Sequence, residues 1–158
     1  MRDYGRVCSI NRVLLVEPDV DTREMYVDFF AWRGVGVAGV PGAVEAVRAA
    51  CIRMPEAVIT CLRMPKVDGF ELCDALPGTN RTARIPVIAL SSCLPGHDRA
   101  LGDSRFAAVL LKPCLPDVLL RTLRIVLATG HPRAIPLRFP YDRVLPSMNG
   151  TYPSVRFR

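Results

Sequence analysis

Four groups of residues that could do chemistry each follow a short apolar run of the sequence. They are Glu17-Pro18-Asp19, Cys61, Ser91-Ser92 and Lys112-Pro113. An ammonium beside a thiol lowers the pKa of the thiol, so Lys112 beside Cys61 would indicate a reactive thiolate. Beside Glu17, the same ammonium would form a structural ion pair, which is the interpretation that we favour for Lys112. The choice depends on the elements that position these groups.

Strand and helix patterns alternate along the chain. Continuous apolar runs, typical of strands covered on both faces, occupy residues 12–17, 35–40, 57–61, 86–90 and 107–111. Helical periodicity or capping signals mark residues 21–33, with Asp21 as N-cap, and 44–54, 70–76 and 115–126, with a brief, weak helix expected within 91–105. Strict alternation predicts an α/β fold, a doubly wound five-stranded parallel sheet flanked by five helices. Ligands of such folds lie outside the carboxyl ends of the strands, where the four groups would meet.

The chain divides into an N-terminal extension at 1–11, a domain at 12–128 and a Pro-rich basic tail at 129–158. The tail holds five arginines against one aspartate, so it carries most of the net charge of +6. Its five prolines predict that it is disordered, with no helix or paired strand. No apolar run approaches the roughly 20 residues that cross a bilayer. We therefore expect a cytoplasmic protein with no membrane partner.

The six cysteines and two histidines show no metal-binding or disulfide pattern. The cysteines lie far apart and form no Cys-x-x-Cys pair. Such spacing argues against zinc and against a disulfide framework. We expect free thiols that pack as small apolar side chains in a reducing compartment.

Four stretches of the sequence closely resemble one family. They are VLLVEPDVDTREMY at 13–26, ITCLRMPKVDGFEL at 59–72, IPVIALSS at 85–92 and LLKPCLPDVLL at 110–120. Their order and spacing over about residues 12–128 are similar to the receiver domains of response regulators in two-component signalling. The resemblance implies the flavodoxin-like receiver fold. In that family an aspartate at the end of the third strand accepts a phosphoryl group from a histidine kinase. Mg²⁺ is held there by this aspartate and an acidic pair after the first strand.

The resemblance assigns roles to five residues of this chain. Lys112 matches the family's lysine, Pro113 the proline after it, a candidate for a cis peptide, and Ser91 the hydroxyl residue after the fourth strand. Glu17 matches the first acid of the metal site. The backbone carbonyl of Arg63 matches a metal ligand.

Two positions depart from the family pattern. Cys61 replaces the phosphoacceptor aspartate, and Pro18 replaces the second acid. Asp19 lies one residue further along and would have to swing back to substitute. Mg²⁺ prefers hard oxygen ligands and a thiolate is soft, so we expect Mg²⁺ to bind weakly or not at all. The sequence therefore indicates a pseudo-receiver that has lost aspartyl phosphorylation.

These observations predict a stand-alone receiver-like protein of phosphorelay signal transduction, without enzymatic activity. It would dock to a histidine kinase, a phosphotransferase or another regulator through about residues 95–128. A thiol redox sensor at Cys61 is an alternative, with Cys114 as the only plausible resolving partner, although we favour an inert thiol. Nucleic-acid binding by residues 129–158 is the other alternative. We disfavour it, because the tail has no reading motif and only modest charge density.

Overall fold

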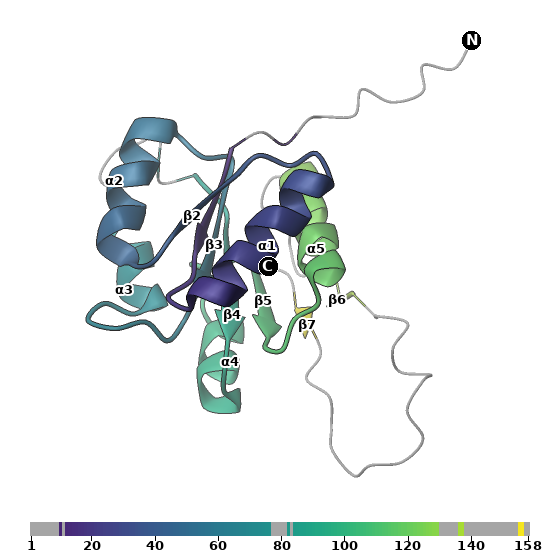
Figure 1. Cartoon of the computed structure of the whole chain (residues 1–158). Helices are drawn as coiled ribbons and strands as arrows, with labels where there is room; N and C mark the ends of the chain where they lie inside the picture. The colour runs from purple at the N-terminus through teal and green to yellow at the C-terminus, as the bar shows by residue number, and fades with distance from the viewer. Residues whose placement is uncertain are drawn as a thin grey trace.

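The computed structural model describes residue 10, residues 12–76, residue 82 and residues 84–129, together with the backbone of 136–137 and 155–156. The main strands are β1 (Val13–Val16), β2 (Val37–Val40), β3 (Ala57–Cys61), β4 (Val87–Ser91) and β5 (Ala108–Leu111). The helices are α1 (Val20–Trp32), α2 (Ala43–Arg53), α3 (Gly69–Ala75), α4 (Leu94–Leu101) and α5 (Pro116–Thr129). The predicted alternation of five strands with five helices is confirmed (Figure 1).

The five strands form one parallel sheet in the order β2-β1-β3-β4-β5. Successive side chains of a strand point to opposite faces, so a strand covered on both faces must be apolar throughout. In β1, Val13 and Leu15 pack into one apolar cluster, whereas Leu14 and Val16 pack into the other. This two-sided burial explains why the strands read as continuous apolar runs.

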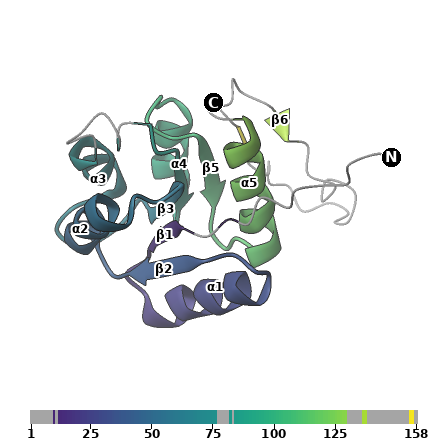
Figure 2. The same ribbon diagram turned by 90° about the horizontal axis from the view of Figure 1, so that it is seen from above.

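Helices cover both faces of the sheet. Figures 1 and 2 show α1 and α5 on one face, and α2, α3 and α4 on the other. The first cluster includes Tyr26 and Phe30 of α1 with Leu119 and Leu123 of α5. The sheet is thereby the middle layer of three, and its strand ends stay free to carry the site.

Helix α1 begins earlier than the sequence predicts. Asp19 is the N-cap, because its carboxylate accepts a hydrogen bond of 2.8 Å from the backbone N–H of Thr22. The prediction of Asp21 as N-cap was wrong, and Asp21 lies instead in the first turn, where a negative charge favours the helix dipole. At the other end Gly34 adopts φ +74°, a conformation that suits glycine after a helix.

The two helices beside the predicted site are both short. Helix α3 starts with a capping box, in which Asp68 and Glu71 each accept a hydrogen bond from the other's backbone N–H. Helix α4 has eight residues, which confirms the brief helix expected there. Pro95 fits in its first turn because the N–H that proline lacks has no helical partner at that position.

Little of the predicted tail is described. Pro136–Leu137 (β6) pairs antiparallel with Val155–Arg156 (β7), so the expectation of no paired strand was wrong at these residues. A ladder of two residues needs few backbone donors and can therefore include a proline. Most of 1–11 and of 129–158 lies outside the described residues, so the predicted disorder is untested. Within the described part, no helix combines the length and apolarity needed to cross a membrane.

Gly69, the first residue of α3, offers a test of how tightly the loop after β3 is packed. A Cβ at Gly69 would lie 2.7 Å from the carbonyl oxygen of Cys61 and 3.0 Å from the Cα of Leu62, both backbone atoms. We expect Gly69→Ala to lower the free energy of unfolding by about 1–3 kcal/mol, measured by urea denaturation. Gly96→Ala, in the first turn of α4, meets only side-chain atoms at 3.3 Å and should change it by less than about 0.5 kcal/mol. Equal losses in the two variants would contradict this packing.

Candidate functional site

The strand register brings the predicted groups to one edge of the sheet. Val16 pairs with Thr60, so the next residues, Glu17 and Cys61, lie side by side. Strand β4 separates β3 from β5, and Lys112 directly follows β5. The Lys112 side chain extends past the end of β4 to reach Cys61 and past the ends of β4 and β3 to reach Glu17.

Glu17, Cys61 and Lys112 meet in one contact. The Cys61 thiol donates to Oε2 of Glu17 at 2.7 Å, and Nζ of Lys112 donates to the same oxygen. The Glu17 side chain is 3% exposed and that of Lys112 is 21% exposed. The structure thus confirms the predicted ion pair of Lys112 with Glu17 and adds the thiol as a second donor. The Lys112–Pro113 peptide is cis, as the resemblance implied.

The surroundings keep the thiol protonated and the lysine charged. Burial and the hydrogen bond to Glu17 raise the pKa of Cys61 to about 12, and the nearby Lys112 only partly opposes this. Burial lowers the pKa of Lys112, but its contacts with Glu17 and Cys61 raise it more, so the net shift is upward. At neutral pH the contact therefore joins a neutral thiol and an ammonium to one carboxyl group.

Asp19 does not join this contact. Its carboxylate caps α1, and the hydrogen bond from Thr22 lowers the pKa of Asp19. The backbone N–H of Asp19 donates to Oε1 of Glu17 at 3.2 Å. Asp19 therefore supports Glu17 through its backbone and caps α1 with its carboxylate, and its role as a substitute metal ligand stays a prediction.

Ser91 and Arg63 also lie at this edge without touching Glu17. Ser91 is buried at the end of β4, where its hydroxyl donates to the carbonyl of Cys93 at 2.7 Å. Arg63 lies in the loop after β3, and none of the described residues donates a backbone hydrogen bond to its carbonyl oxygen. Ser91 thus lies at the end of β4 and Arg63 in the loop after β3, and neither takes part in the three-way contact, so their predicted roles stay predictions.

Two contacts that the sequence did not reveal hold the surrounding loops. Nη1 of Arg23 donates to the carbonyl of Glu17 at 2.6 Å, and the hydroxyl of Tyr26 donates to the carbonyl of Cys114 at 2.6 Å. Both side chains come from α1 and bind backbone atoms of the loops after β1 and β5. A bond to a backbone carbonyl depends on no particular partner residue, so no sequence motif signals it.

The residues present do not fit a Mg²⁺ site. Mg²⁺ demands a near-octahedral set of hard oxygen ligands. Here one carboxylate oxygen of Glu17 already accepts two hydrogens, Cys61 offers a neutral thiol, and Asp19 is turned to its helix. In the described part of the chain, no group of three or more His, Cys, Asp or Glu residues could hold a metal ion.

Solved structures with the same architecture include response regulators. The chemotaxis response regulator CheY4 of Vibrio cholerae superposes with a TM-score of 0.68 at 24% identity, over 74% of this chain and 98% of that one. A response regulator from Desulfuromonas acetoxidans superposes with a TM-score of 0.67 at 29% identity, over 75% and 97%. The first likeness shows the fold alone.

Sequence comparisons agree. An uncharacterized 14.6 kDa protein of Leptolyngbya boryana is 31% identical over 113 residues, 71% of this chain and 86% of that protein. The response regulator MprA of Mycobacterium tuberculosis is 29% identical over 122 residues, 77% of this chain and 52% of MprA. The chain spans about half the length of MprA and of the transcriptional regulatory protein GltR of Pseudomonas aeruginosa. The model of the response regulator receiver domain matches residues 13–124. This chain belongs to the response regulator receiver domain family.

Proposed function

We propose that this receiver domain acts in two-component signalling by docking to other proteins, without aspartyl phosphorylation and without enzymatic activity. One observation carries the proposal: Oε2 of Glu17 accepts hydrogens from both Cys61 and Lys112. Three side chains at the positions that the family uses for phosphoryl transfer, Glu17, Cys61 and Lys112, are here hydrogen-bonded to one another.

The chemistry of phosphoryl transfer supports the proposed loss of aspartyl phosphorylation. A carboxylate nucleophile must approach an anionic phosphorus, so a metal ion and an ammonium have to offset the negative charge that gathers. Cys61 stays a neutral thiol at physiological pH, since its pKa is raised to about 12. Of the carboxylates expected at the metal site, Glu17 is the one that takes part in the three-way contact. We infer that Mg²⁺ binds weakly or not at all.

Lys112 takes over a part of the metal's electrostatic role. A buried carboxylate is costly unless it is paired and hydrogen-bonded. The ammonium of Lys112 supplies that pairing and joins the ends of β1 and β5, while the thiol of Cys61 adds β3. Because these three groups are bonded to one another, the site favours a receiver with a single fixed state.

A receiver without phosphate still has a surface for partners. Receiver domains interact with histidine kinases and other regulators, and we place docking on α4, β5 and α5, about residues 95–128. Leu115 exposes 57% of its surface there, and Arg121 and Arg124 are exposed on α5. The partner would be a histidine kinase, a phosphotransferase or another regulator, and the cytoplasm, where such partners are found, is the expected location.

The structure weighs against the redox alternative. A redox-sensing cysteine is accessible and has a lowered pKa. Cys61 is buried, and its pKa is raised to about 12; burial also raises the pKa of Cys114 to about 12. The nucleic-acid alternative rests on residues 129–158, nearly all of which lie outside the described residues.

Phosphorylation provides the direct test. We expect intact-mass analysis of the native protein, incubated with Mg²⁺ and a small phosphoryl donor, to show no added phosphoryl group, because Cys61 is no carboxylate and Mg²⁺ lacks ligands. Cys61→Asp restores the nucleophile, and Pro18→Asp/Cys61→Asp restores the acidic pair as well. The double variant should gain one phosphoryl group, which shows that the scaffold is intact. Phosphorylation of the native chain would overturn the proposal.

The ion pair gives a second prediction. We expect Lys112→Gln to lower the free energy of unfolding by about 1–3 kcal/mol at pH 7, because it leaves a buried carboxylate without its cation. Adding Glu17→Gln should recover part of this loss in a double-mutant cycle followed by urea denaturation. Because the folded pKa of Lys112 lies above the ordinary 10.5, the coupling seen at pH 7 should persist up to pH 10.5 and vanish as the pH rises through the folded value.

Glu56→Gln is the matched control for the ion pair. It breaks the surface ion pair in which Nε of Arg12 lies 3.7 Å from Oε1 of Glu56. We expect it to lower the free energy of unfolding by less than about 0.5 kcal/mol. If Lys112→Gln costs no more than this control, the pair does not stabilise the site.

Docking can be mapped by photo-crosslinking in the source organism. A photoreactive residue at Leu115 should capture a histidine kinase, phosphotransferase or other regulator, because position 115 borders the proposed surface. The control is Ile52 on α2, which exposes 82% of its surface. Identical adducts from both positions, or adducts from position 52 only, would contradict this location.

A further inference from the structure

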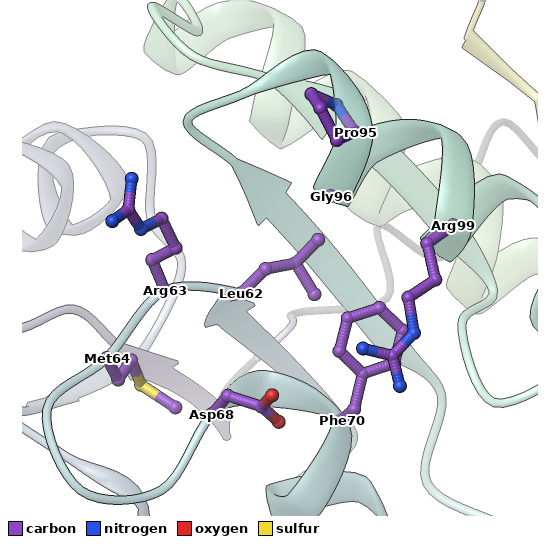
Figure 3. Close-up of a pocket in the computed structure, with 8 residues that line it drawn as sticks. All are labelled: Leu62, Arg63, Met64, Asp68, Phe70, Pro95, Gly96 and Arg99. Carbon is purple, nitrogen blue, oxygen red and sulfur yellow. The ribbon is translucent and has the colours of Figure 1, made fainter.

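A cavity of about 410 Å³ opens between the loop after β3 and the first turn of α4 (Figure 3). Leu62, Met64 and Phe70 supply apolar walls, and the guanidinium-bearing side chains of Arg63 and Arg99 border it. Leu62 directly follows Cys61 in the sequence, but none of the lining residues takes part in the three-way contact. The cavity therefore needs an explanation of its own.

The guanidinium of Arg99 lies over an aromatic ring. Its central carbon lies 4.0 Å from the centroid of the Phe70 ring, and Figure 3 shows the two side chains next to each other at the cavity. Phe70 is buried and packs edge to face on Phe106, with the centroids 5.2 Å apart and the planes at 80°. A guanidinium placed over a ring keeps N–H donors that can bind a carboxylate. The ring thus positions Arg99 in advance.

Arg105 shows what such a guanidinium does when an acid is near. Its central carbon lies 5.3 Å from the same ring, and its N–H groups donate to Asp74 and Asp103 at distances from 2.7 Å. Within the described residues, Arg99 has no carboxylate partner of this kind. Arg105 and Arg99 thus lie beside the same Phe70 ring. Within the described residues, Arg105 is paired with aspartates, whereas the N–H donors of Arg99 remain available for a carboxylate from outside the domain.

The charges around the cavity favour an anion. Asp68 is the one acid among the lining residues, and its carboxylate already accepts the backbone N–H of Glu71 as the cap of α3. Arg63 and Arg99 outnumber it. The apolar walls fit the methylene stem of an acidic side chain, whose carboxylate would reach the donors of Arg99.

We propose that this cavity binds an acidic side chain of a partner protein, with Arg99 as the carboxylate receptor. The proposal rests on the docking function above and names the chemistry of its partner. Pro95, Gly96 and Arg99 belong both to the cavity and to the docking surface at about 95–128, so an acidic segment that crosses α4 reaches both.

Nuclear magnetic resonance titration of the full native chain tests the site. The probe is a blocked hexaglutamate peptide, and blocked hexaglutamine is the uncharged control. We expect saturable shifts of the Arg99 Nε–H signal and of the backbone amides at 96–99 with hexaglutamate only. Arg99→Gln should weaken binding by roughly tenfold, and Arg99→Lys, which keeps the charge without the planar fork, by less. Arg48→Gln, the same charge change on an exposed position of α2, should leave the affinity unchanged.

Three outcomes would overturn the site. They are shifts that do not saturate, equal weakening in Arg99→Gln and Arg48→Gln, and tighter binding of inorganic phosphate than of hexaglutamate at the same signals, which would assign the cavity to small free anions. The titration uses neither Mg²⁺ nor a phosphoryl donor. Phosphorylation of the native chain would therefore overturn the proposed function and leave this result standing, whereas a failed titration would leave that function intact.

Discussion

The arrangement of the site depends on the buried carboxylate of Glu17. A charge removed from water must be compensated, or the domain loses a large part of its marginal stability. The compensation comes from two other strand ends, Lys112 after β5 and Cys61 at the end of β3. One side chain thereby ties three strands of the sheet together at the edge where this fold family places its chemistry.

That compensation requires the loops to be held in place. The parallel register sets Glu17 beside Cys61, and Lys112 must reach past the ends of β4 and β3 to pair with Glu17. Helix α1 secures the loops on either side, with Arg23 on the carbonyl of Glu17 and Tyr26 on the carbonyl of Cys114. The apolar face of α1 and the polar edge of the sheet are therefore parts of one packed unit, in which the ion pair does not act alone.

Sequence reasoning succeeds where one physical rule decides the outcome. A strand covered on both faces must be continuously apolar, and parallel strands bring their carboxyl ends together, so the sheet and the pairing of Glu17 with Lys112 could be predicted. It failed at the start of α1, because Asp19 and Asp21 are both good caps and only the backbone decides between them. The stacking of Arg99 on Phe70 left no signal either, since it joins separate elements without any periodicity.

Cys61 changes the electrostatics of the site as well as its reactivity. A carboxylate at this position would place a second acceptor against Glu17, and two close carboxylates repel each other unless a cation or a proton lies between them. A protonated thiol reverses the polarity of that contact, because it donates a hydrogen to Glu17 where a carboxylate could only accept one. The ammonium of Lys112 is then enough to neutralise the one remaining negative charge, that of Glu17. Under the proposed function, the substitution that replaces the phosphoacceptor aspartate would therefore also remove the need for a divalent cation at this edge of the sheet.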